Sequence, residues 1–131
     1  MDRIDLGEYF FGDTGDVPWF VLWERVYDSV NDRLVKQPMA LAADYNFVKF
    51  SARHQSNNGD FNDHTKDDIY SDLTIVASNK AFYAWGANDL SILGKWFGRL
   101  HFELISGKQF HSRRSFEFSC IKKTSGTFGN V

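Results

Sequence analysis

Between residues 16 and 37, apolar and polar side chains recur with the period of an α-helix. Plotted at about 100° per residue, the apolar side chains fall within one arc and four charged side chains lie opposite. Asp16 is suited to cap this predicted helix, and Pro38 is suited to end it. The apolar arc contains Trp19, Phe20, Leu22, Trp23, Val26, Tyr27, Val30 and Leu34, and the opposite side contains Glu24, Arg25, Asp28 and Asp32.

The same segment is also rich in aromatic and β-branched residues, which favour strands. An alternative interpretation is therefore a strand through Val26 that turns at residues 29–32. We prefer the long helix, because the apolar period of about 3.6 residues persists through most of the segment.

Five other segments have the short apolar or alternating runs that are typical of strands. They are residues 46–53, 73–78, 81–85, 99–105 and 109–121. Asn88 is suited to begin a short helix that Gly98 ends. These elements predict an α+β fold, in which one long amphipathic helix and a short helix pack on a curved antiparallel sheet of four to six strands.

The length of 131 residues predicts a single domain over residues 1–131. Apolar residues make up 43% of the chain and aromatic residues 17%, a composition that excludes disorder. Within this domain, residues 55–72 are predicted to form a long acidic surface loop, and residues 124–131 a C-terminal tail. The acidic N-terminus and the short apolar runs indicate a soluble, cytoplasmic protein that does not bind a membrane.

Charge is distributed unevenly along the chain. Residues 1–72 carry 7 basic and 14 acidic side chains, a balance of −7, and residues 73–131 carry 8 basic and 3 acidic ones, a balance of +5, which together give the net charge of −2. Such asymmetry marks either an anion-binding face or two halves that attract each other inside one fold. In the basic half, aromatic residues lie between the cations, a pattern that also fits nucleic-acid binding.

The hairpin predicted over residues 99–121 has a register that burial patterning defines. Leu104 should oppose Phe110, because opposed residues on paired strands share a face. This pairing requires a loop of odd length, most simply residues 106–108. The polar face of the hairpin then consists of His101, Glu103, His111 and Arg113, with Glu103 opposite His111 and His101 opposite Arg113.

This polar face has the chemistry of a metal-independent ribonuclease, which needs a general base, a general acid and a cation for the phosphate. Glu103 is the candidate base, His101 or His111 the candidate acid, and Arg113 the phosphate-binding cation. Glu103 is also expected to raise the pKa of the adjacent His111. The simpler interpretation, which we prefer, is a solvated strand face whose opposite charges pair across the hairpin.

The acidic loop contains many side-chain oxygens, but their spacing does not fit an EF-hand. His64 together with Asp60 and Asp63 has the ligand types of a weak transition-metal site. We prefer a solvated acidic loop, and we therefore expect no bound metal and no cofactor. Cys120, the single cysteine of the chain, leaves no partner for an intrachain disulfide or for a zinc site of several cysteines, and its strand position predicts burial.

The sequence contains no strong catalytic motif, so we expect a small, non-enzymatic binding protein such as an inhibitor, an immunity-type protein or an assembly component. Its partner is expected to be another protein, bound through opposed charged surfaces. The alternative is a metal-independent ribonuclease or an RNA-binding protein that uses the basic and aromatic C-terminal hairpin. The acidic surface consists of Asp60, Asp63, Asp67 and Asp68, and the basic surface of Lys95, Arg99, Arg113 and Arg114.

Overall fold

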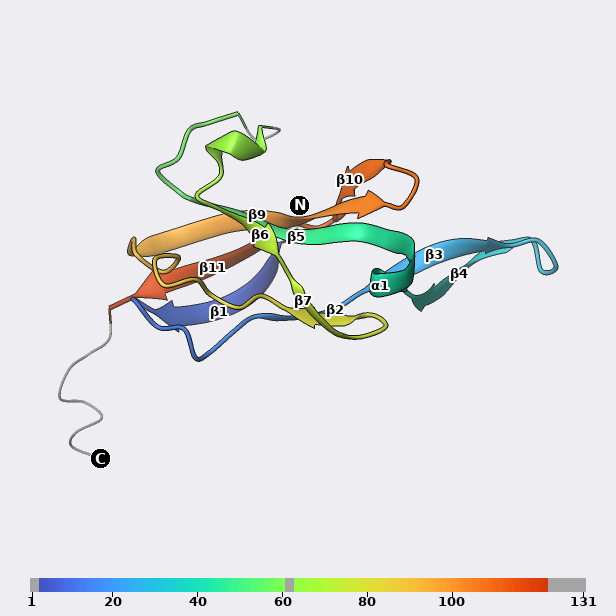
Figure 1. The fold of residues 1–131 in the computed structure, drawn as a ribbon, viewed down its shortest axis with the longest axis horizontal. Coiled ribbons are helices and arrows are strands. Elements are labelled where there is room, and N and C mark those ends of the chain that lie inside the picture. The colour runs from blue at the N-terminus through green and yellow to red at the C-terminus, as the bar shows by residue number, and fades with distance from the viewer. Residues whose placement is uncertain (1–2, 61–62, 123–131) are drawn as a thin grey trace.

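The computed structural model of the protein describes residues 3–60 and 63–122. These residues form eleven strands, one four-residue α-helix and one short 3-10 helix (Figure 1). The strands are β1 (Ile4–Phe10), β2 (Trp19–Val21), β3 (Trp23–Asp28), β4 (Arg33–Pro38), β5 (Tyr45–His54), β6 (Ile69–Asp72), β7 (Thr74–Ala77), β8 (Lys80–Phe82), β9 (Gly94–Leu104), β10 (Gln109–His111) and β11 (Phe116–Ile121). The helical elements are α1 (Leu41–Asp44) and η1 (His64–Lys66). The predicted tail at residues 124–131 lies outside the described residues.

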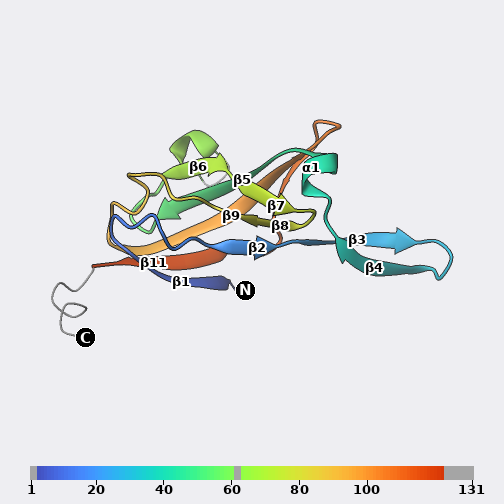
Figure 2. The ribbon, with the colours of Figure 1, turned by 60° about the horizontal axis from the view of Figure 1, so that its bottom comes forward.

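Most of the strands belong to two sheets. The six-stranded main sheet has the order β1-β11-β9-β5-β6, with β10 also paired to β9. Its neighbouring strands are antiparallel except β1 and β11, which run parallel. Strands β2, β8 and β7 form a three-stranded sheet that lies against one face of the main sheet (Figure 2). The hairpin of β3 and β4 belongs to neither sheet.

The core lies between these two sheets and is largely aromatic. Alternation along β5, β9 and β11 sends every second side chain into it, as the pattern of residues 46–53 and 99–105 predicted. Phe50 is fully buried at its centre. It stacks on Tyr83 and on Phe116, at ring-centroid distances of 4.4 and 4.8 Å. Non-local packing of rings on a sheet therefore holds this fold together.

The predicted α+β fold with a long amphipathic helix is wrong. Residues 19–38 instead form β2, β3 and β4, and the chain reverses between β3 and β4 at residues 29–32, as in the alternative strand interpretation. Asp28 supports this turn by accepting a hydrogen bond from the Asn31 side-chain amide at 2.8 Å. Asp32 has a φ of 49°, in the left-handed region that aspartate tolerates. The fold is a β protein rich in antiparallel strands, because strand propensity and turn chemistry outweigh the helical period.

The short helix predicted after Asn88 is also wrong. Residues 87–90 form turns, in which the Asp89 carboxylate accepts hydrogen bonds from the Gly86 N–H and the Tyr83 hydroxyl, both at 2.6 Å. The chain then enters β9 directly. Among the described residues, no helix has the length and apolar character needed to cross a bilayer.

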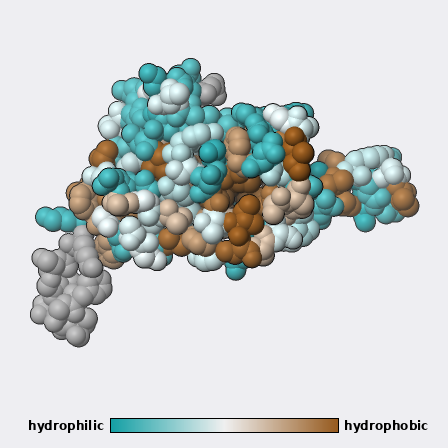
Figure 3. Space-filling model, viewed as in Figure 1, coloured by the Kyte–Doolittle hydropathy of each residue, from teal (hydrophilic) through white to brown (hydrophobic). Residues whose placement is uncertain are grey.

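The β3–β4 hairpin projects from the body of the protein (Figures 1 and 2). Its apolar side chains, which the helix interpretation placed in the core, are largely in water. Figure 3 shows hydrophobic residues among hydrophilic ones along this hairpin and mostly hydrophilic residues over the loop that carries η1. The exposed fractions are 48% for Trp23, 37% for Val26, 56% for Tyr27, 89% for Val30 and 62% for Leu34.

Candidate functional site

The outer face of the main sheet, opposite the core, carries the central residues of the predicted site. Alternation along β5 and β9 places Ser51, Arg53, Arg99 and His101 on this face. The loop that carries η1 folds back over it (Figure 1), and its backbone carbonyls accept hydrogen bonds from Arg53. Arg53 and His101 are therefore buried, with exposed fractions of 7% and 4%. A polar layer fills the space between the loop and the sheet.

The pairing of β9 with β10 differs from the predicted register. The loop between them has an odd length, as predicted, so the side chains lie on the predicted faces, but it begins one residue earlier. His101 consequently pairs with His111, and Glu103 pairs with Gln109. The predicted pairing of Glu103 with His111 is wrong.

A bend after β10 explains this difference. The chain that connects His111 at the end of β10 to Phe116 at the start of β11 is two residues longer than the stretch of β9 between their partners, His101 and Gly98. Ser112 stabilises the bend, because its N–H donates to the Leu100 carbonyl at 2.9 Å and its Oγ accepts from the Leu100 N–H at 3.1 Å. The strand predicted over residues 109–121 is therefore divided, and Arg113 lies in the bend instead of opposite His101.

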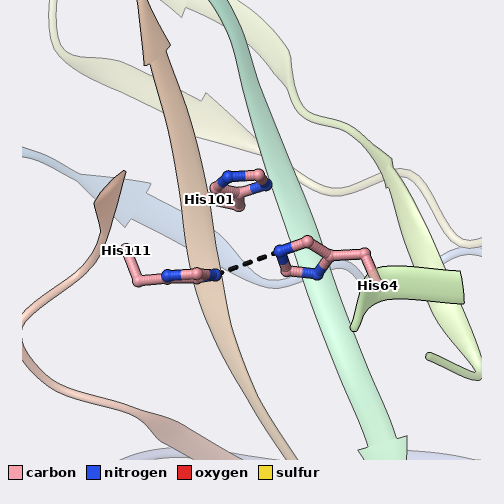
Figure 4. A group of neighbouring side chains, drawn as sticks. All are labelled: His64, His101 and His111. Atoms are coloured by element: carbon pink, nitrogen blue, oxygen red, sulfur yellow. Dashed lines mark hydrogen bonds between the residues drawn. The ribbon is translucent and has the colours of Figure 1, made fainter. Parts of the chain in front are cut away.

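Three histidines, which we call the histidine cluster, meet on this outer face. His101 and His111 come from adjacent strands, and His64 comes from η1 in the overlying loop (Figure 4). The Nε2 atoms of His64 and His111 are 3.1 Å apart. The ring of His101 stacks beside both, with centroids 4.3 Å from His64 and 4.6 Å from His111. One ring nitrogen from each histidine lies within 4.8 Å of the others.

Asp67 holds His64 from the buried side of the cluster. Its Oδ2 lies 2.8 Å from Nδ1 of His64 and accepts a hydrogen bond from the Ser51 hydroxyl at 2.6 Å. Its Oδ1 accepts from Nε of Arg53 at 2.6 Å. The Asp67 side chain is 2% exposed and that of Arg53 is 8% exposed. Asp67, predicted to be part of an exposed acidic surface, is therefore a buried anchor of the histidine cluster.

Tyr70, on β6, contacts two members of the cluster. Its hydroxyl lies 2.5 Å from Nδ1 of His101, and its ring stacks on His64 with a centroid distance of 4.4 Å. Tyr70 and Asp67 thus each contact a histidine through Nδ1. These contacts leave the Nε2 atoms of His64 and His101 for other partners.

The protonation of the cluster also differs from the expectation. Burial, and next the charge of Arg99, lowers the pKa of His111 to about 4. The prediction that Glu103 raises this pKa is wrong, since the Glu103 carboxylate accepts a hydrogen bond from Asn46 at 2.9 Å instead. His111 is therefore neutral at pH 7, and it is poorly suited to the acid role in a metal-independent ribonuclease.

The other acidic loop residues have different surroundings from Asp67. Asp60 and Asp68 are exposed, whereas Asp63 caps η1 by accepting a hydrogen bond from the Thr65 N–H at 3.0 Å. Within residues 55–72 the chain forms η1 and the edge strand β6. The segment is therefore an acidic loop only in part, because its last residues join the main sheet.

A groove of about 550 Å³, which we call the hairpin groove, lies between the base of the β3–β4 hairpin and β10. Of the predicted basic residues, Arg113 lines it, together with Arg25 and Lys36 of the hairpin. Glu24 is the one acidic residue among the described residues of its lining. Its remaining lining consists of Leu22, Trp23, Met39, Tyr45, Phe102, Phe110, His111 and Ser112.

The remaining predicted cations lie elsewhere. Lys95 forms an exposed ion pair with Glu117 at 3.7 Å, and Arg114 is exposed in the bend after β10. Arg99 lies on the outer face, where its charge acts on His111. The predicted basic residues are thus divided between the groove, the cluster and the open surface.

Sequence reasoning missed two features of this arrangement. It grouped His64 with Asp60 and Asp63, because the return of the loop over the sheet leaves no signal in the local pattern. It also missed Arg25 and Lys36, although the alternative strand interpretation, with its turn at residues 29–32, pairs these two residues across the hairpin.

Comparisons with protein-family models, curated proteins and solved structures give no match for this chain.

Proposed function

We propose that this protein is a non-enzymatic binding protein, such as an assembly component or an inhibitor, that contacts another protein through the β3–β4 hairpin and the hairpin groove. The carrying observation is that the hairpin projects from the body (Figure 2). Most of its side chains are exposed. A two-stranded hairpin alone is marginally stable in water. Contact with a partner would bury its apolar side chains and stabilise it.

The side chains of the hairpin are arranged as a contact surface. Cross-strand partners share a face, so Arg25 and Lys36 lie together between the pair of Tyr27 with Leu34 and the indole of Trp23. Lys36 Nζ lies 4.9 Å from the centre of the Trp23 ring. Tryptophan, tyrosine and arginine dominate the energetics of protein interfaces. This face of the hairpin therefore combines apolar anchors with positive charge.

The charge of the hairpin groove indicates the chemistry of the partner. Arg25, Lys36 and Arg113 line it against the single carboxylate of Glu24, and aromatic and aliphatic side chains form its other walls. A complementary ligand is an acidic segment of a protein that also carries apolar side chains. The basic surface expected from the sequence contributes Arg113, and the hairpin supplies the other two cations.

Selection of displayed random peptides on the full chain tests this proposal. We expect enriched peptides to carry aspartate or glutamate next to aromatic or aliphatic residues. Their affinity should fall by about 10-fold or more for the variant with Arg25→Glu and Lys36→Glu, because each reversal replaces attraction by repulsion. The matched control carries Lys66→Glu and Lys122→Glu, the same charge change at exposed positions outside the groove, and should bind as the wild type does.

Two experiments can contradict the proposal. The peptide selection does so if no acidic peptide is enriched, or if the enriched peptides bind the groove variant and the wild type equally. The other experiment is incubation of the protein with labelled single-stranded RNA, with and without a chelator. Salt-sensitive RNA binding without peptide binding would identify an RNA-binding protein instead. Cleavage of the RNA in both samples would identify a metal-independent ribonuclease.

A further inference from the structure

We propose that His64, His101 and His111 form a binding site for one divalent transition-metal ion, such as Zn²⁺. Imidazole nitrogens suit this class of metals, and three histidine ligands with one open position are a known arrangement for zinc. The site adjoins the protein contact proposed above, because His111 also lines the hairpin groove. It uses three of the four histidines of the chain. Cys120 contributes nothing to it, because its thiol is buried in the core.

The pair formed by His64 and His111 already has the spacing that zinc requires. At a Zn–N distance of about 2.0–2.1 Å, two ligands of a tetrahedral ion lie roughly 3.3 Å apart. The observed separation of the two Nε2 atoms is 3.1 Å. Without a metal, one of these nitrogens must carry a proton and donate a hydrogen bond to the other. A bound ion replaces that proton and accepts both lone pairs.

The partner of His64 orients it for this role. Asp67 contacts Nδ1 of His64 at 2.8 Å, so a proton on Nδ1 leaves the Nε2 lone pair directed at His111. Arg53 and Ser51 fix the carboxylate of Asp67 in turn, each at 2.6 Å. A carboxylate that holds the far nitrogen of a histidine ligand is the usual outer contact of zinc sites.

The third ligand, His101, has the same kind of support. The Tyr70 hydroxyl lies 2.5 Å from its Nδ1. When Nδ1 carries the proton and donates to the hydroxyl oxygen, Nε2 has the lone pair that a metal needs, and the ion then competes with the hydrogen bond between this ring and the Gln109 side chain. The His101 ring is nearly parallel to its neighbours, at 21° to His64 and 16° to His111 (Figure 4). It therefore presents its face to them, and coordination requires the ring to tilt about χ2. The three ligand atoms start within 4.8 Å of one another, so this tilt is a local movement.

Titration of the metal-stripped full chain with Zn²⁺, followed by calorimetry, tests the site. We expect one ion per chain. His64→Gln, His101→Gln and His111→Gln should each weaken binding by more than about 100-fold, a larger effect than the loss of an outer contact. The matched control is His54→Gln, at the fourth histidine, which contacts Ser56 and the Leu93 carbonyl instead of the cluster. This variant should bind Zn²⁺ as the wild type does.

Two further measurements separate metal binding from a loss of fold. Co²⁺ bound in place of Zn²⁺ should give the intense visible absorption of a tetrahedral site, and the His111→Gln variant should lack it. Tyr70→Phe removes a single hydroxyl and should weaken Zn²⁺ binding by about 10-fold, while circular dichroism without metal stays unchanged. The proposal is overturned if the wild type does not bind Zn²⁺, or if His54→Gln weakens binding as much as the three cluster variants do.

Discussion

Arg53→Ala is expected to lower the free energy of unfolding by about 3–5 kcal/mol, the cost of breaking a buried ion pair from one side. Arg53 donates to Oδ1 of Asp67 and to the carbonyl oxygens of Gly59, Asp60 and Asp63. Without the guanidinium, the buried Asp67 carboxylate loses its ion-pair partner at 2.6 Å, and the loop loses four attachments. Denaturant titration measures the loss of stability.

Hydrogen exchange and a matched ion pair complete this test. In Arg53→Ala, the described parts of the loop, residues 55–60 and 63–68, should exchange much faster than in the wild type. Lys49→Ala is the control, because Lys49 pairs with Asp72 at 3.3 Å with side chains 25% and 69% exposed. That variant should lose less than about 1 kcal/mol. Equal losses in the two variants would contradict the role of Arg53 as the buried anchor of the loop.

The second large effect is expected for Trp96→Ala, at about 3–5 kcal/mol. Trp96 is 1% exposed, its ring stacks on Phe118 at a centroid distance of 5.7 Å, and its indole N–H donates to the Ile92 carbonyl at 3.1 Å. Trp23→Ala should cost less than about 1 kcal/mol, because Trp23 is 48% exposed and its ring contacts Lys36 on the hairpin surface.

The same substitution at two tryptophans also distinguishes the two interpretations of residues 16–37. A long helix packed on the sheet requires Trp23 to be as costly to remove as Trp96. A projecting hairpin requires the large difference that the exposed fractions indicate. Denaturant titration of both variants measures it, and similar losses of stability would be evidence for a packed helix and against the observed fold.

Alternation of apolar side chains predicted the core faces of the main sheet. Within residues 99–105, the even-numbered and odd-numbered residues were assigned to opposite faces, and the burial of Leu100 and Phe102 in the core agrees with that assignment. This inference succeeds because the side-chain period of a strand is a local property of the backbone. The prediction that the following loop has an odd number of residues was correct for the same reason. A loop with an even number would pair residues that belong to opposite faces of the hairpin.

The apolar period of residues 16–37 predicted the wrong element. A helical period indicates a helix only when its apolar face is buried, and burial depends on where the chain places the segment. Here Tyr27, Val30 and Leu34 project into solvent, so their spacing carried no information about packing. The Asp28 turn and the aromatic and β-branched content were the local signals that favoured two strands.

The candidate site, like the fold, could be predicted from the sequence only in part. The sequence by itself determined that His101 and His111 lie on the polar face of the C-terminal hairpin and that Cys120 is buried. Only the tertiary structure decided that these two histidines oppose each other, because the bend after β10 shifts the register by two residues. It also decided that His64 joins them, because the loop returns over the sheet through contacts between residues far apart in sequence. Asp67 is buried there in an ion pair with Arg53. Pattern analysis compares near neighbours along the chain, so it does not detect pairs of residues that are far apart in sequence.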